Sequence, residues 1–113
     1  MKTFIIGAEA EANVVAKNWL IAGTSLGVKP CASAVAPLGV AETTVSAGDL
    51  VGVIKQGLFK AVAVTGTYAF GDIVELDSSG QKLVAGTTAP VGTIAEDLVL
   101  SADGEILVYV NVA

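Results

Sequence analysis

Two carboxylates, Glu75 and Asp77, lie two residues apart in a strand-like segment, so both side chains would point to the same face of a sheet. Paired carboxylates can perform acid–base chemistry on sugars. No cleft-forming aromatic residues accompany this pair, which favours a solvated strand face beside a turn. Asp72 and Ser78 nearby suggest a calcium loop, but the alternating ligands and late Glu of that motif are missing. The pattern therefore predicts neither a catalytic nor a metal site.

The chain contains no His and a single Cys, Cys31. This excludes His-dependent triads, Cys–His pairs and Cys-rich or His-ligated metal sites. A lone thiol without an activating base is interpreted as a small buried hydrophobe, and it favours an intracellular or assembly compartment over secretion. Lys82 follows a turn, as in lipoyl or biotinyl carriers, but its neighbours do not match theirs. We therefore expect no enzyme activity and no cofactor.

The 113 residues have a mass of 11.3 kDa, and 53% of them are hydrophobic but only 5% aromatic. A chain of this size forms one domain with a core of small branched side chains and leaves apolar surface for a partner. The net charge is −5 and all six basic residues are Lys, which argues against nucleic acid as a ligand. Charge-free runs such as residues 83–95 contain Gly, Thr and Pro, so we expect no membrane span and no targeting segment.

The elements that would position these side chains are short strands, because glycine recurs at turn-like intervals between Val- and Thr-rich runs. The expected strands are residues 50–55, 58–64, 73–77, 82–85, 91–95, 98–101 and 105–112. Gln56-Gly57 is expected to turn the chain between the first two strands, and Asp103-Gly104 to form a hairpin before the last. Alternation in the last strand predicts one face of Ile106, Val108, Val110 and Val112 and another of Leu107, Tyr109 and Asn111.

A four-residue pattern occurs twice, as Gly48-Asp49-Leu50-Val51 and as Gly71-Asp72-Ile73-Val74. Each copy predicts a turn that enters a strand, in which the Asp side chain accepts a hydrogen bond from the backbone of its own turn. A binding role for either Asp is the alternative interpretation.

The first third of the chain is harder to interpret. Residues 8–20 fit either a short helix or a strand or extended arm, and Pro30 and Pro37 bracket a linker or edge strand. The layout predicted is an N-terminal arm or subdomain at residues 1–37 and a compact β-domain at residues 38–113. The fold class is all-β, with a small β-barrel or β-sandwich-like domain. Trp19 is expected in the core of its own chain, with a partner anchor as the alternative. The aromatic residues Phe59, Tyr68 and Phe70 are expected to pack in the core or in turns.

From residue 38 onward the order of short motifs resembles a known family. The motifs are Gly39-Val40-Ala41, Gln56-Gly57-Leu58-Phe59, Phe70-Gly71-Asp72-Ile73-Val74, Lys82-Leu83-Val84 and Val91-Gly92-Thr93-Ile94-Ala95, followed by the terminal strand at residues 105–112. This order is similar to that of the capsid cement, or head decoration, proteins of tailed bacteriophages. The resemblance covers about two thirds of the chain and leaves out the first 37 residues.

The resemblance implies a structural protein made in the host cytoplasm that binds the outside of an expanded phage head. It implies the major capsid protein as partner, often with the decoration protein as a homotrimer, and no catalytic residues. As candidate contacts with the capsid or with a neighbouring protomer we name Phe4, Ile5, Ile6 and Trp19. The alternative function is a surface-displayed binding module, either an adhesin or a carbohydrate-binding domain, which would need an exposed aromatic platform.

Overall fold

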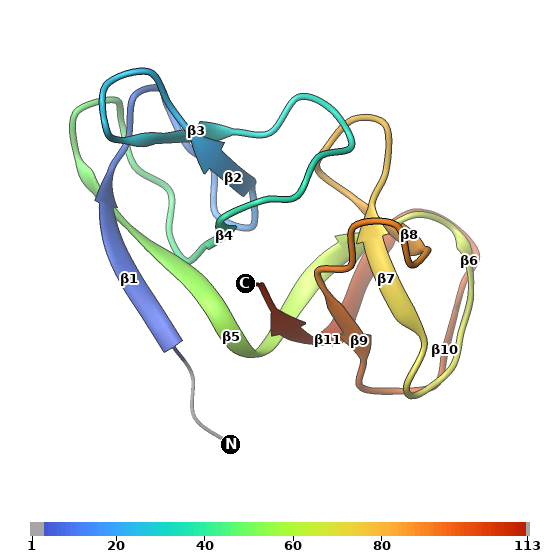
Figure 1. Ribbon diagram of the computed structural model, residues 1–113. Helices are drawn as coiled ribbons and strands as arrows, with labels where there is room; N and C mark the ends of the chain where they lie inside the picture. The colour runs from blue at the N-terminus through green and yellow to red at the C-terminus, as the bar shows by residue number, and fades with distance from the viewer. Residues whose placement is uncertain (1–3, 113) are drawn as a thin grey trace.

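The computed structural model describes residues 4–112, with the side chain of Phe4 excluded. These residues form an all-β fold, which confirms the predicted class, and no helix among them is long and apolar enough to cross a membrane (Figure 1). The strands are β1 (Phe4–Glu9), β2 (Trp19–Ala22), β3 (Val28–Pro30), β4 (Gly39–Ala41), β5 (Leu50–Ala63), β6 (Gly66–Tyr68), β7 (Ile73–Leu76), β8 (Leu83–Ala85), β9 (Gly92–Ile94), β10 (Leu98–Leu100) and β11 (Gly104–Asn111).

Part of the sheet closes into a small barrel. β5 pairs with β11, and β9, β7 and β8 follow in order until β8 returns to β5 through the parallel pair Ala63 and Leu83. β6 and β10 form a separate two-stranded sheet. Outside the barrel, β1 and β4 pair with the first half of β5, and β2 and β3 extend the sheet from β4.

The long strand β5 connects these two parts and bends between them (Figure 1). Its partner β1 places Ile5 opposite Ile54 but Phe4 opposite Gln56, so Lys55 is an extra residue on β5. A β-bulge of this kind bends a strand and shifts which side chains face inward. As a result, β5 contributes to two hydrophobic clusters.

The smaller cluster consists of Ala10, Val14, Leu20, Val28, Ala41, Val51 and Val53. The larger cluster fills the barrel with residues that include Ile106, Val108 and Val110, and it also takes in Trp19 from β2. Both clusters therefore draw on residues from each side of position 37, and the division of the chain at that position stays a prediction.

Two turn predictions are wrong. Gln56 and Gly57 do not turn the chain, because both pair with β11 in an unbroken ladder, opposite Asn111 and Val110. Asp103-Gly104 does not join paired strands, because β10 pairs with β6 while β11 lies between β5 and β9. In each case the strand that pairs with these residues is distant in sequence. A local turn motif carries no information about such a partner.

The remaining strands agree with the expectation. Ile106, Val108 and Val110 on β11 and Val112 directly after it are buried, and Leu107, Tyr109 and Asn111 are not, which confirms the alternation. Residues 8–20 contain no helix. They end β1, make isolated bridges at Ala10 and Val14, and begin β2. Cys31 is buried as expected, and burial raises the pKa of its thiol to about 11.

Candidate docking surface

The expected contact residues of the N-terminal segment lie in different surroundings. Ile5 on β1 is 42% exposed, whereas Ile6 packs partly against the smaller cluster, and the side chain of Phe4 lies outside the described part of the chain. Trp19 is fully buried in the larger cluster, which confirms its expected burial within its own chain. Its Nε1 has no hydrogen-bond partner among the described residues. The contact role of these four residues stays a prediction.

The carboxylates of Glu75 and Asp77 hold loops in place. Glu75 Oε2 accepts hydrogen bonds from the N–H groups of Thr88 and Ala89, at 3.1 and 3.0 Å. Asp77 Oδ1 accepts bonds from the hydroxyl and the N–H of Ser79. Burial raises the pKa of Asp77, but the hydrogen bonds from Ser79 and from neighbouring N–H groups outweigh it, and the pKa lies below its ordinary value. Within residues 4–112, no three His, Cys, Asp or Glu residues cluster as a metal site would require.

Both Gly-Asp turns form as predicted. Asp72 Oδ2 accepts a hydrogen bond from the N–H of Ala69 at 2.9 Å, and Asp49 Oδ2 accepts one from Ser46 at 3.4 Å. Gly48 and Gly71 have φ values of +93° and +91°, a region that favours glycine. The turns are therefore structural elements.

The outside of the barrel carries a row of mainly apolar side chains across four strands. Leu58 on β5 lies opposite Tyr109 on β11, Tyr109 opposite Thr93 on β9, and Thr93 opposite Ile73 on β7. Leu58 is 49% exposed and Ile73 is 43% exposed, although both belong to strands that are buried on their other face. Apolar side chains that are exposed along one continuous face, rather than singly, indicate a surface that another molecule covers.

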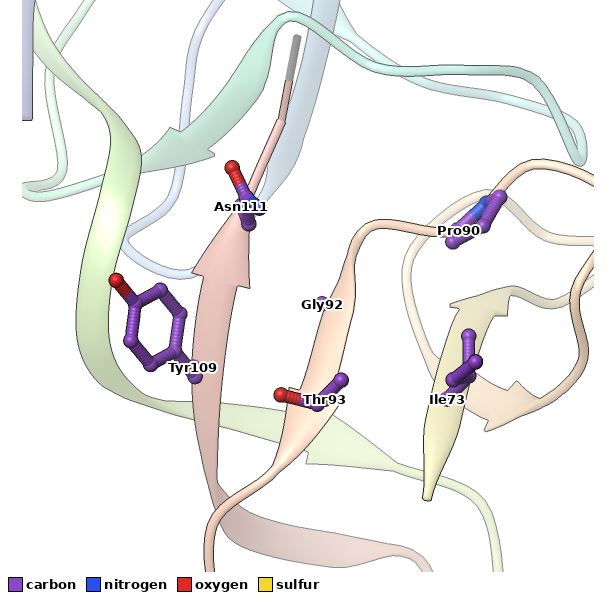
Figure 2. A pocket seen from close by; sticks show the side chains of 6 residues that line it. All are labelled: Ile73, Pro90, Gly92, Thr93, Tyr109 and Asn111. Carbon is purple, nitrogen blue, oxygen red and sulfur yellow. The ribbon is translucent and has the colours of Figure 1, made fainter. Parts of the chain in front are cut away.

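Two shallow hollows lie along this row. The first has a volume of about 390 Å³ and is lined by Ile73, Pro90, Gly92, Thr93, Tyr109 and Asn111 (Figure 2). The second has about 290 Å³ and is lined by Leu58, Phe70, Gly71, Thr93, Ile94, Ala95, Leu107 and Tyr109. Thr93 and Tyr109 line both hollows, so the two are adjacent. None of the described residues that line them is charged. We call Leu58, Phe70, Ile73, Thr93, Leu107 and Tyr109 the outer apolar face.

Gly92 allows the strands under this face to approach each other. A Cβ atom at this position would collide with the carbonyl oxygen of Tyr109 on β11.

The outer apolar face was not predicted from the sequence. Phe70 was expected in the core or in a turn, and it lies in a turn, where its side chain is 73% exposed. The terminal strand carries a signal for this face. Leu107 and Tyr109 lie on the side of the strand opposite the buried residues, so both sides of the strand are apolar.

Carboxylates bind the backbone of two residues of the second hollow. Asp97 Oδ1 accepts a hydrogen bond from the N–H of Phe70 at 2.9 Å, and Glu96 Oε2 accepts one from Leu107 at 2.7 Å. The basic residue Lys60 lies opposite Leu107 on β5. The second hollow is thus apolar inside with a mainly acidic rim.

A family model described as phage cement protein matches residues 3–110. Among solved structures, the chain is similar to the head fiber gp8.5 N base in bacteriophage phi29, with a TM-score of 0.62 and 19% sequence identity. The similarity covers 97% of this chain and 95% of the phi29 chain, and at this identity it shows a shared fold. No curated protein matches the sequence.

Proposed function

Because the chain belongs to the phage cement protein family, we propose that it binds the outer surface of the expanded phage head and joins neighbouring capsid subunits. In this role it stabilises the shell against the pressure of packaged DNA, with the major capsid protein as its partner. The protein is made in the host cytoplasm, acts without catalysis and assembles on the shell as a homotrimer.

The observation that carries the proposal is the match of the phage cement protein family over residues 3–110. The outer apolar face on a closed barrel adds a preformed surface for a partner, either a capsid subunit or a neighbouring copy. The side chains of this face stand on paired strands, so little conformational entropy is lost when a partner covers them. Each contact with the shell then needs only modest affinity. A trimer that engages several capsid subunits gains about 10²–10⁴ in overall affinity through effective concentration alone.

For the contact with the capsid we assign β1. Among the described strands β1 pairs with β5 alone, so its second edge is open to an extended segment of another chain. Ile5 is exposed on this strand, and a Cβ atom at Gly7 would meet nothing within 4 Å. A strand from the major capsid protein therefore has both backbone groups and an apolar side chain to bind.

Co-sedimentation with phage heads that lack this protein tests the function. We expect saturable binding to expanded heads at a fixed ratio to the major capsid protein, and weaker binding to unexpanded heads. Absence of binding to either form would contradict the proposal.

A point variant tests the β1 contact, because deleting residues 1–12 would also remove β1 and the buried Ala10. Ile5→Glu is expected to weaken binding to heads by at least about tenfold, since a charge replaces an apolar contact. Val15→Glu is the matched control, because Val15 is also exposed but lies outside the strands. Equal binding by the two variants would remove β1 from the interface.

The alternative function, a carbohydrate-binding module, would place a sugar against the two aromatic side chains of the outer apolar face, Phe70 and Tyr109. Thr93 lines the same hollow and supplies a hydroxyl for hydrogen bonds with sugar hydroxyls. A glycan array distinguishes the two functions, since the cement protein binds heads and no glycan.

A further inference from the structure

The loop between β2 and β3 presents a leucine in an unusual way. Leu26 is fully exposed, and its φ of +68° lies in the left-handed region, which bulky side chains rarely occupy. Gly or Asn would adopt this backbone conformation at a lower free-energy cost, and neither would expose a large apolar side chain to water. An exposed apolar side chain in a disfavoured backbone conformation indicates a binding role, because folding alone gains nothing from it.

The loop is held rigidly by one carboxylate. Glu11 accepts hydrogen bonds from the N–H groups of Thr24 at 2.9 Å, Ser25 at 3.0 Å and Gly27 at 2.8 Å, and the N–H of Gly23 bonds to the carbonyl of Gly27 at 2.8 Å. A Cβ atom at Gly23 or Gly27 would collide with Glu11, so the two glycines let the loop close around the carboxylate. The backbone that carries Leu26 is therefore held in place before any partner arrives, which lowers the entropy cost of binding.

The second hollow of the outer apolar face is a receptor for such a side chain. Leu58, Phe70, Leu107 and Tyr109 give it apolar walls, and its volume is about 290 Å³. An apolar cavity of roughly 150 Å³ already accepts a benzene-sized molecule. An aliphatic side chain therefore fits.

Leu26 cannot reach this hollow within its own chain. The β2–β3 loop lies at the upper left of the molecule, and the turn between β6 and β7, which carries Phe70, lies at the lower right (Figure 1). The longest dimension of the chain is 38 Å, and the two features lie toward opposite ends. Any contact between them is made by two copies.

The charges beside the two features are complementary. Lys29 follows Leu26 by three residues, is exposed, and makes no ion pair with the described residues. The hollow has Glu96 and Asp97 at its rim, each bonded to the backbone of a lining residue, and Lys60 opposite Leu107, so acidic groups outnumber basic ones there. Face-to-face pairing of two hollows would instead bring like charges together, which disfavours a symmetric contact between identical patches.

We propose that Leu26 of one copy inserts into the second hollow of the next copy, with Lys29 beside the acidic rim. This inference rests on the proposed function, in which several copies act together, and it names the surfaces that join them. The contact is heterologous, since the inserted residue and its receptor are different parts of the chain. Repeating it produces a closed ring when the rotation between copies allows closure. The remaining surfaces, including β1, stay available for the shell.

Sedimentation equilibrium of the purified full chain tests the contact. We expect wild-type protein to self-associate, and Leu26→Gly to weaken association by at least about tenfold, since one buried aliphatic side chain is lost. Leu26→Gly suits the test because glycine favours the φ that the loop requires, so folding is preserved. Leu50→Ala is the matched control, because Leu50 is also exposed and begins β5. Association of Leu26→Gly at wild-type strength, or a wild-type monomer at up to about 1 mM, would overturn the proposal.

A mixing experiment identifies the geometry. Phe70→Asp removes the receptor and Leu26→Gly removes the inserted side chain, so each variant alone is expected to be monomeric. A mixture retains one intact contact and is expected to form dimers and no larger species. A mixture that stays monomeric would overturn the heterologous arrangement.

A charge series at Lys29 gives a second test in the same assay. Lys29→Glu is expected to weaken association more than the neutral Lys29→Gln does, because this side chain is placed beside an acidic rim. Equal association by the two variants would contradict the assigned orientation. Binding of wild-type protein to expanded heads is measured separately. Self-association can therefore be absent while binding to heads is observed, and binding to heads can be absent while self-association is observed.

Discussion

The turn before β5 and the turn before β7 have matching backbones. In the first turn, the N–H of Gly48 bonds to the carbonyl of Ala10 at 2.7 Å, and the N–H of Ala10 bonds to Asp49 at 2.9 Å. In the second turn, Gly71 and Asp72 make the same two bonds with Ile94, both at 2.8 Å. Each turn thereby clamps a neighbouring strand to the strand that it begins.

The residue before the glycine differs between the two turns. It is Ala47 in the first turn and the exposed Phe70 in the second, where it forms a wall of the second hollow. After the glycine and aspartate, each turn continues with an exposed and then a buried apolar residue, Leu50-Val51 and Ile73-Val74. The comparison teaches that the Gly-Asp pair is a scaffold and that the preceding side chain determines what the scaffold presents.

The largest difference is expected at that position. Phe70→Ala should weaken self-association by at least about tenfold, or about 1.4 kcal/mol, because an aromatic wall is lost. Its free energy of unfolding should change by less than about 0.5 kcal/mol, because the side chain is mostly exposed. Sedimentation equilibrium and urea unfolding measure the two effects.

Two variants serve as controls for that result. Val99→Ala removes another exposed side chain outside the hollow, and Ala47→Phe places an aromatic ring on the first turn. Both should associate as wild type does. Loss of association in Val99→Ala would show that general hydrophobicity, and not Phe70, determines the contact.

The glycines should be equally sensitive. Gly48→Ala and Gly71→Ala are each expected to lower the free energy of unfolding by about 1–2 kcal/mol, because both need a left-handed backbone. A Cβ atom would meet nothing within 4 Å at either position, so steric collision adds nothing. Gly7→Ala, where a Cβ atom also meets nothing, is the control and should be nearly neutral. If the losses in unfolding free energy of Gly48→Ala and Gly71→Ala, measured by urea unfolding, differ by more than about 1 kcal/mol, the two turns are not equivalent.

The aspartates should differ by a smaller amount. Asp72→Ala is expected to cost about 1 kcal/mol of folding free energy, because its hydrogen bond to Ala69 is 2.9 Å long. Asp49→Ala should cost less than half as much, since the corresponding bond to Ser46 measures 3.4 Å. The reverse order in urea unfolding would show that these side chains contribute by another route.

The smallest effect concerns pH beside the first turn, where Glu11 follows Ala10. The N–H of Ser25, together with those of Gly27 and Thr24, lowers the pKa of Glu11 below its ordinary 4.5, against the opposing effect of burial. A carboxylate with a lowered folded pKa stabilises the fold above the unfolded value, and this stabilisation is lost as the pH falls through the folded value. The stability advantage of wild type over Glu11→Gln should therefore be largest near pH 7 and shrink below about pH 4.5. An advantage that is constant with pH would contradict this assignment.

Local patterns in the sequence predicted local structure well. The alternation at residues 106–112 and the Gly-Asp pairs at 48–49 and 71–72 were confirmed, because strand period and turn hydrogen bonds depend on neighbours within a few residues. Gln56-Gly57 and Asp103-Gly104 were misinterpreted for the converse reason. Their residues are positioned by β11 and by Thr65, whose N–H bonds to Asp103 at 2.8 Å.

The candidate surfaces show the same limit. The sequence indicated that some apolar surface would stay uncovered, and Ile5 was predicted from it as a contact residue. The outer apolar face and the Leu26 loop were not located. Leu58, Tyr109, Thr93 and Ile73 form a row only because β5, β11, β9 and β7 lie in that order. Leu26 is distinctive only because Glu11, fifteen residues earlier, closes its loop.

By itself, the sequence determined an all-β class, the positions of most strands, the absence of His-based chemistry and the resemblance to phage cement proteins. These properties follow from composition and from periodicities that span a few residues. The tertiary structure alone decided which strands are neighbours, which face of each strand is covered, and which apolar side chains remain outside. The physical reason is that side-chain burial depends on contacts between residues far apart in the chain, and those contacts form only when the barrel closes.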